Sequence, residues 1–229
     1  MRFNLFLLTL CLLLICDKNM SQSMNSNTPL TYLALGDSYT IGEAVEQKLS
    51  FPYQLVSELA TQNVFVTTPK IIAKTGWTTD ELQSAIKVEN VTQKFDIVTL
   101  LIGVNNQYRG NSRITYRKEF AALLQTAISY ANGNKKHVFV VSIPDWGITP
   151  FGKSSGKDIA KISAEIDAFN AIAKEETLAM NVSYTDITLG SRYAGTDLSL
   201  VATDGLHPSG KMYAEWAVKV SNAVVAAFK

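Results

Sequence analysis

Residues 32–39 read Tyr-Leu-Ala-Leu-Gly-Asp-Ser-Tyr, a short apolar run followed by a Gly-Asp-Ser turn. This pattern predicts a buried strand that ends in a tight turn. Such a turn would hold Ser38 rigidly, with its hydroxyl facing a cleft and its backbone N–H free. Gly, Asp and Ser also form ordinary surface turns, so the tripeptide needs partner residues elsewhere in the chain before it indicates a chemical site.

Beyond Pro29 the sequence alternates strand-like apolar runs with helical stretches, which predicts a parallel sheet covered by helices on both faces. The predicted strands are residues 31–35, 95–102, 137–143 and 182–187, together with a strand of undefined extent within residues 64–73, which Pro69 interrupts. The predicted helices begin near residue 50 and then cover 78–88, 113–131, 157–180 and 209–228, with a loop over 188–204. The predicted fold class is α/β, a three-layer α/β/α sandwich with a five-stranded parallel sheet of the flavodoxin-like type.

The sheet would bring three polar motifs to one place. Ser38 follows the first predicted strand, residues 103–106 follow the third, and residues 204–207 follow the fifth. Because ligands bind outside the carboxyl ends of parallel strands, all three motifs are predicted to lie at the ligand-binding edge.

Length and composition restrict the class of protein. The chain has 229 residues, of which 47% are hydrophobic and 18% charged, and these values predict one well-buried domain over residues 28–229. The net charge of +1, without blocks of like charge, favours a small or neutral molecule as partner over nucleic acid. No metal-ligand cluster is visible in the sequence, so we expect neither a metal nor a cofactor.

The N-terminus differs from the rest of the chain. Met1 and Arg2 precede an apolar run of about a dozen residues, which is too short for a membrane span and predicts an export signal over residues 1–23 with a polar tether. Residues 13–16 resemble a bacterial lipobox, which would place a lipid on Cys16 and attach the protein to a membrane. Ile15 is larger than the residue usual before that cysteine, so cleavage near residues 21–23 is the alternative. The predicted location is therefore exported: periplasmic, membrane-anchored or secreted.

A serine hydroxyl is a weak nucleophile at neutral pH and needs a base, usually histidine. The chain has two histidines. His137 opens a buried strand at the opposite edge of the predicted sheet, which favours a structural role. His207 follows Asp204 by three residues at the same edge as Ser38, and across a turn Asp204 can accept the Nδ1 proton of His207. The alternative is that Asp204 and His207 only cap the last helix, whose start Pro208 marks.

A tetrahedral intermediate also needs hydrogen-bond donors directed at its oxyanion. The candidates are the N–H of Ser38, the N–H of Gly76 and the side-chain amide of Asn105. Asn105 and Asn106 could instead be ordinary turn formers.

The blocks Gly36-Asp37-Ser38, Gly76, Gly103-x-Asn105 and Asp204-x-x-His207 occur in this order and resemble those of the GDSL or SGNH hydrolase family from about residue 30 to the C-terminus. The resemblance implies Ser38 as nucleophile, His207 as general base and then acid, and Asp204 as its orienting partner. It also implies that Ser38 N–H, Gly76 N–H and the Asn105 side chain form the oxyanion hole.

The chain departs from the family pattern at two positions. The family's third block usually ends in aspartate where this chain has Asn106, and its first block commonly has leucine where this chain has Tyr39. We expect Tyr39, Asn106 and Trp146 to lie at the pocket, with packing as the alternative role of Tyr39 and Trp146. The sequence thus predicts an exported serine ester hydrolase for a small-molecule ester, either carboxylesterase- or lysophospholipase-like or a carbohydrate O-deacetylase. The alternative is a non-catalytic surface protein that binds glycans or lipids.

Overall fold

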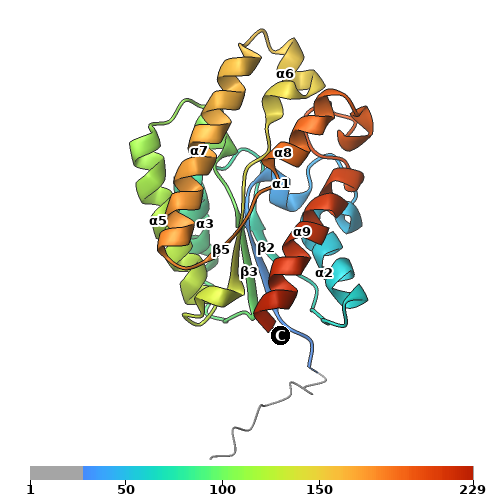
Figure 1. Cartoon of the computed structure of the whole chain (residues 1–229). Coiled ribbons are helices and arrows are strands. Elements are labelled where there is room, and N and C mark those ends of the chain that lie inside the picture. Colours follow the sequence, from blue (N-terminus) through green and yellow to red (C-terminus); the bar gives the residue numbers. More distant parts are fainter. Residues whose placement is uncertain (1–27, 229) are drawn as a thin grey trace, which may run out of the picture.

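A computed structural model describes residues 28–228 and contains one five-stranded parallel sheet in the order β2-β1-β3-β4-β5 (Figure 1). The strands are β1 (Tyr32–Gly36), β2 (Lys70–Ala73), β3 (Ile97–Leu101), β4 (Val138–Val141) and β5 (Ser183–Thr185). The helices are α1 (Ser38–Ile41), α2 (Phe51–Thr61), α3 (Thr79–Glu89), α4 (Val104–Tyr108), α5 (Arg113–Tyr130), α6 (Pro150–Ser154), α7 (Ile159–Ala179), α8 (Thr188–Ser191) and α9 (Gly210–Phe228). The predicted α/β sandwich and its flavodoxin-like strand order are confirmed.

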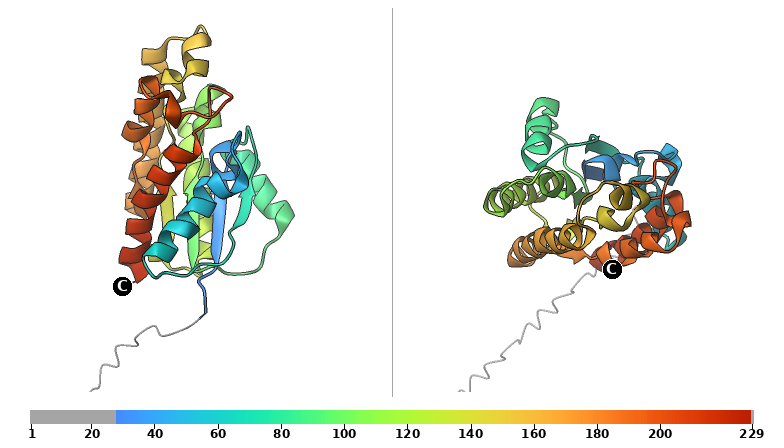
Figure 2. Two further views of the ribbon diagram at one scale, coloured as in Figure 1. Left: turned by 90° about the vertical axis from the view of Figure 1, so that its right-hand side faces the viewer. Right: turned by 90° about the horizontal axis from the view of Figure 1, so that it is seen from above.

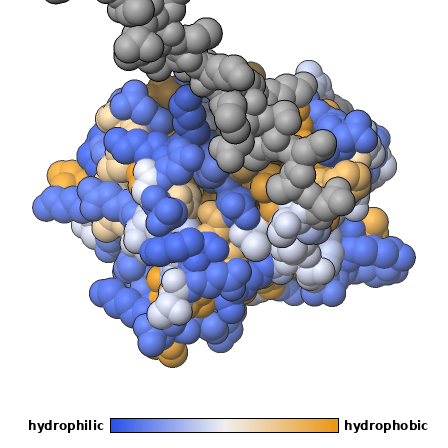
Figure 3. All heavy atoms as spheres, turned by 90° about the horizontal axis from the view of Figure 1, so that it is seen from below, coloured by the Kyte–Doolittle hydropathy of each residue, from blue (hydrophilic) through white to orange (hydrophobic). Residues whose placement is uncertain are grey.

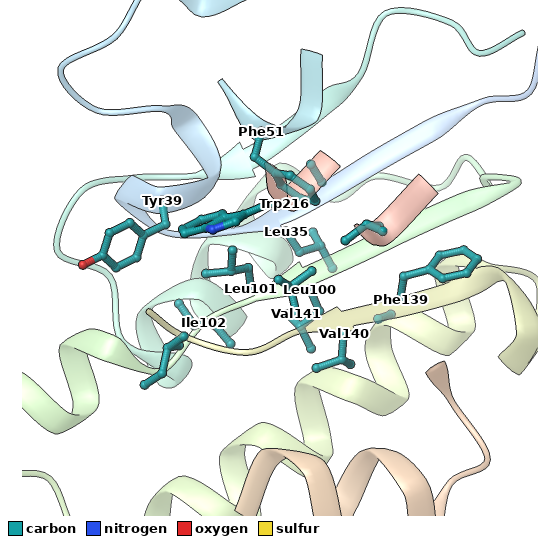
Figure 4. Packing of buried hydrophobic residues seen from close by; sticks show 14 of the residues in the cluster. Leu35, Tyr39, Phe51, Leu100, Leu101, Ile102, Phe139, Val140, Val141 and Trp216 are labelled. Carbon is teal, nitrogen blue, oxygen red and sulfur yellow. The ribbon is translucent and has the colours of Figure 1, made fainter. Parts of the chain in front are cut away.

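Helices cover both faces of the sheet. Helices α2 and α9 pack together on one face, whereas α3, α5 and α7 lie on the other (Figure 2). Every residue of β1, β3 and β4 is buried, because these central strands are covered on both faces. The core extends to the carboxyl end of the sheet, where Tyr39 lies beside Trp216 of α9 (Figure 4).

The amino-terminal ends of the strands lie at the lower end of the molecule in Figure 1. The surface seen from this side is mostly hydrophilic, with scattered hydrophobic residues (Figure 3). Within residues 28–228, no helix is both long enough and apolar enough to cross a membrane. The predicted signal, the tether and Cys16 lie outside the described residues, so the prediction of a lipid anchor stays a prediction.

The structure defines one strand whose extent the sequence left open and corrects one predicted loop. The second strand, predicted within residues 64–73 with an interruption at Pro69, covers Lys70–Ala73, because Pro69 lacks the N–H that a ladder needs and Val66 forms only a single bridge to Leu30. The predicted loop over 188–204 contains α8 and two turns of 3₁₀-helix, at Arg192–Gly195 and Leu198–Leu200. The sequence pattern missed them because each is at most four residues long and buries only one or two side chains.

Candidate active site

One cavity brings together residues that are far apart in the sequence. It has a volume of about 230 Å³, and Ser38, Gly76, Asn105 and His207 all contribute to its wall. Ser38 follows β1, Asn105 follows β3, and the segment with His207 precedes α9 at the same edge of the sheet. The prediction that these motifs share the carboxyl edge is confirmed, because a single cavity contacts all of them.

Ser38 is the first residue of α1 and its residue surface is 5% exposed. The preceding residue, Asp37, caps this helix, because its carboxylate accepts the N–H of Tyr39 at 3.0 Å. The N–H at the first position of a helix has no intrahelical acceptor, so that of Ser38 is available to a ligand. Ser38 therefore offers both its hydroxyl and its N–H near the cavity.

The Asp37 carboxyl is completely buried. Burial raises its pKa to about 7, although the hydrogen bonds from backbone N–H groups act in the opposite direction. Its second oxygen lies 3.5 Å from Nδ2 of Asn105. The Asp37 side chain therefore joins the turn after β1 to the segment after β3.

His207 and Asp204 form a close pair. Nδ1 of His207 lies 2.5 Å from Oδ2 of Asp204, while Oδ1 accepts the N–H groups of Leu206 and His207. Partial burial acts to raise the pKa of Asp204, but the hydrogen bonds from His207 and from the two N–H groups outweigh it and lower the pKa below its usual value. All these bonds stay within one loop, so Asp204 does not cap α9, and the capping alternative is wrong.

Gly76 lies in a turn in which the N–H of Trp77 donates to the carbonyl of Lys74 at 3.2 Å. Its φ of +86° is that of the third residue of a type II turn, a conformation that favours glycine. In the described structure, no intramolecular hydrogen bond uses the N–H of Gly76. This N–H is therefore also available at the cavity.

Asn105 and Asn106 lie in α4 rather than in a turn, so the turn-former alternative is wrong. Nδ2 of Asn105 donates to the carbonyl of Trp77 at 3.0 Å. Asn106 is fully buried and does not line the cavity, which corrects its predicted position. Its side chain instead accepts the N–H of Thr79 at 3.1 Å and donates to Oγ1 of Thr79 at 2.8 Å, so that it holds the start of α3.

Tyr39 and Trp146 line the cavity as predicted, and both are also packed. Tyr39 meets the His207 ring edge-on, with ring centroids 5.6 Å apart. Nε1 of Trp146 donates to Oε1 of Gln107 at 2.8 Å, which fixes the indole against the cavity.

The sequence did not identify five further wall residues: Thr75, Val104, Tyr108, Phe151 and Leu206. The Tyr108 ring packs against Trp146, and Nζ of Lys157 lies 4.3 Å from the Tyr108 centroid. Tyr108 follows Asn105 by three residues, and a helix starting at Val104 would have placed both on one face. Recognition of α4 in the sequence would therefore have identified Tyr108.

His137 lies away from the cavity, in a 3₁₀ turn before β4, where its ring stacks on Phe228 with centroids 4.3 Å apart. Burial lowers its pKa below the usual value. Across residues 28–228, no group of three or more histidine, cysteine, aspartate or glutamate side chains is arranged to hold a metal ion.

Comparisons with known proteins identify a family for the sequence and related folds for the structure. The family model described as GDSL-like Lipase/Acylhydrolase matches residues 34–215. The comparison with curated protein sequences gave no match.

Several solved structures share the fold. The lipase/acylhydrolase from Enterococcus faecalis is 21% identical, with a TM-score of 0.67 over 86% of this chain and 96% of that chain. Esterase EstA from Pseudoalteromonas sp. is 14% identical, with a TM-score of 0.64 over 86% of this chain and 97% of that one. The acetyl xylan esterase Axe2 from Geobacillus stearothermophilus is 16% identical, with a TM-score of 0.60 over 85% and 94%. At these identities the likeness establishes the fold.

Proposed function

Because this chain belongs to the family of GDSL-like lipases and acylhydrolases, we propose that it is an exported serine ester hydrolase acting on a small or short-chain acyl ester. The observation that carries the proposal is the His207–Asp204 pair at 2.5 Å, with the histidine in the wall of the cavity that also holds Ser38. A base oriented by a carboxylate beside a serine is the arrangement that nucleophilic acyl transfer requires.

In the proposed reaction, Ser38 Oγ attacks the ester carbonyl while Nε2 of His207 takes the hydroxyl proton. The C–O bond to the alcohol then breaks, and His207 returns the proton to the departing alcohol. A water molecule, deprotonated by His207, attacks the acyl-enzyme and releases the acid and free Ser38. Asp204 keeps Nδ1 of His207 protonated throughout, and the N–H groups of Ser38 and Gly76 with the Asn105 amide stabilise both oxyanions.

The test combines labelling with kinetics. A fluorophosphonate probe should give one covalent adduct on Ser38, and Ser38→Ala or His207→Ala should lower turnover of a short-chain nitrophenyl ester by several orders of magnitude. Asn105→Ala should cost about 10²–10³ in kcat. A wild-type protein without an adduct would contradict the proposal and favour a binding protein. Full activity in Ser38→Ala would refute Ser38 as the nucleophile.

The class of ester is the finer part of the proposal. A carboxylesterase or lysophospholipase would prefer acyl esters or lysophospholipids, whereas an O-deacetylase would prefer acetylated sugars. The aromatic wall of Tyr39, Tyr108 and Trp146 can accept an acyl chain or a sugar ring. Initial rates measured over the three substrate classes at equal concentration would distinguish these preferences.

Export and a lipid on Cys16 also belong to the proposal. They rest on the short apolar run before Cys16. Metabolic labelling of cells with a clickable fatty acid should mark the wild-type protein and not Cys16→Ala. Equal labelling of both would contradict attachment at Cys16.

A further inference from the structure

Helix α4 and Arg109, the residue that caps its C-terminal end in a helical conformation, contact the Gly76 loop at two consecutive carbonyl groups. Nδ2 of Asn105 donates to the carbonyl of Trp77 at 3.0 Å, and Nη2 of Arg109 donates to the carbonyl of Gly76 at 2.6 Å. Asn105 and Arg109 are four positions apart, so they leave the helix on the same face, one turn apart. The loop is therefore attached to α4 by two side chains.

The Arg109 guanidinium is itself held in place. Its Nη1 donates to Oε1 of Glu81 at 3.2 Å, while Oε2 of Glu81 accepts the N–H of Thr78 at 2.9 Å. The hydrogen bond from Thr78, with the nearby arginine, keeps the pKa of Glu81 below its usual value. Arg109 and Glu81 thus close a ring of hydrogen bonds around residues 76–78.

The loop needs such a restraint because its central residue is glycine. Gly76 has no Cβ and adopts positive and negative φ about equally readily. A change in φ or ψ at Gly76 would rotate the peptide planes on either side of it and redirect its N–H. A charge-assisted hydrogen bond to the Gly76 carbonyl opposes that rotation.

We propose that Arg109 is a positioning residue of the oxyanion hole: it fixes the Gly76–Trp77 peptide and thereby directs the Gly76 N–H at the reacting carbonyl oxygen. The inference rests on the proposed ester hydrolysis. Arg109 acts through the backbone and does not touch the substrate. Because the side chains of Arg109 and Glu81 are 46% and 39% exposed, their pairing contributes little to global stability, so positioning can be measured apart from folding.

The experiment compares Arg109→Ala, Arg109→Lys and Glu81→Gln with the wild-type protein. The control variant is Arg113→Ala, which also removes one arginine charge but does so at the start of α5. Kinetics are measured with a short-chain nitrophenyl ester, and active sites are counted with the fluorophosphonate. The inhibition constant of phenylboronic acid supplies the decisive readout. Its boron bonds to Ser38 Oγ to give a tetrahedral adduct, one oxygen of which occupies the oxyanion hole.

Arg109→Ala should lower kcat about tenfold with KM within about twofold, and raise the phenylboronic acid inhibition constant by about the same factor as kcat falls. Arg109→Lys should recover part of both, because lysine can reach a carbonyl but lacks the fork that also engages Glu81. Glu81→Gln should have a smaller effect in the same direction, and Arg113→Ala should have none.

An unchanged inhibition constant in Arg109→Ala would overturn the inference, whether kcat is also unchanged or has fallen only in proportion to the number of active sites. That result, obtained with a wild-type protein that reacts with the fluorophosphonate, leaves the proposed function intact. A wild-type protein that does not react refutes the proposed function itself.

Discussion

The buried contact between Asn106 and Thr79 gives a sharp prediction, because Asn106 stands where the family pattern usually has aspartate. Three groups form a chain with a fixed direction: Nδ2 of Asn106 donates to Oγ1 of Thr79 at 2.8 Å, and that hydroxyl donates to Oε2 of Glu119 at 2.5 Å. Asn106→Asp would replace the first donor with an acceptor. The single hydroxyl proton of Thr79 would then face two carboxylates.

The size of the effect follows from these distances. Asn106→Asp removes the hydrogen bond that Nδ2 of Asn106 donates to Thr79. In a buried site, a polar group left without its hydrogen-bond partner costs about 1–3 kcal/mol. The two carboxylates would lie about 5 Å apart across Thr79, where repulsion is about 3 kcal/mol at an effective dielectric constant of 20. Because Glu119 is only partly buried and solvent reduces the repulsion, we expect Asn106→Asp to lower the free energy of unfolding by about 3 kcal/mol in total.

Glu119→Gln should rescue the variant by reversing the direction of the chain. Nε2 of the introduced glutamine can donate to Oγ1 of Thr79, and the hydroxyl can then donate to the aspartate introduced at Asn106. Urea unfolding of the wild type, both single variants and the double variant at pH 7 gives the coupling free energy, expected at about 1–3 kcal/mol in favour of the double variant. Near pH 4, where carboxylates begin to bind protons, the cost of Asn106→Asp should shrink. Additive single effects, within about 0.5 kcal/mol, would refute the reasoning.

Four further substitutions have defined outcomes. Burial raises the folded-state pKa of Asp37 to about 7, above its unfolded value, so its contribution to stability is present at low pH and is lost as the pH rises to 7. The free energy of unfolding should therefore fall by at most about 1.4 kcal/mol per pH unit between pH 5 and 7, and urea titrations of Asp37→Asn should show a flatter profile. Gly103→Ala should destabilise the fold by about 3 kcal/mol, because φ is +131° and a Cβ would lie 2.6 Å from Oη of Tyr116. Gly110→Ala, at φ +71° with no neighbour within 4 Å, should cost only about 1 kcal/mol, and urea unfolding of both glycine variants measures the difference. Asp204→Asn should lower kcat about 10³–10⁴-fold, because His207 would adopt the wrong tautomer. The number of active sites that react with the fluorophosphonate should stay unchanged.

The sequence predicts those elements of the fold that are long helices with periodic apolar residues or strands with a continuous apolar run. Helix α7 carries apolar residues at steps of three and four over 21 residues, and β3 is apolar except for Thr99, so both appear near their predicted positions. Helices α1, α4 and α6 have four or five residues each, too few for a period to emerge. Their ends depend on contacts with distant residues, which no local pattern contains.

The same distinction applies to the site. Ser38 could be named from the sequence because a turn follows an apolar run there, and His207 because Asp204 precedes it by three residues at the same predicted edge of the sheet. The position of Asn106 could not be predicted, since its contact with Thr79 spans 27 residues and depends on how α4 meets α3. Tyr108 was missed for the same reason: it lines the cavity only because α4 is a helix.

The hydrogen bonds of Asn105 are compatible with both of its proposed roles, as a support of the Gly76 loop and as a donor to the oxyanion. Its Nδ2 carries two hydrogens, and the two contacts differ in length: 3.0 Å to the carbonyl of Trp77 and 3.5 Å to the carboxyl of Asp37. The shorter bond fixes the plane of the amide, whereas the longer one is at the limit of a hydrogen bond and is easily exchanged. In the proposed mechanism, an oxyanion at the cavity would accept the second hydrogen in place of Asp37, while the bond to Trp77 keeps the amide in position. Replacing Asn105 with aspartate would remove both donors at once, and should reduce kcat at least as much as Asn105→Ala while the fluorophosphonate still reaches Ser38.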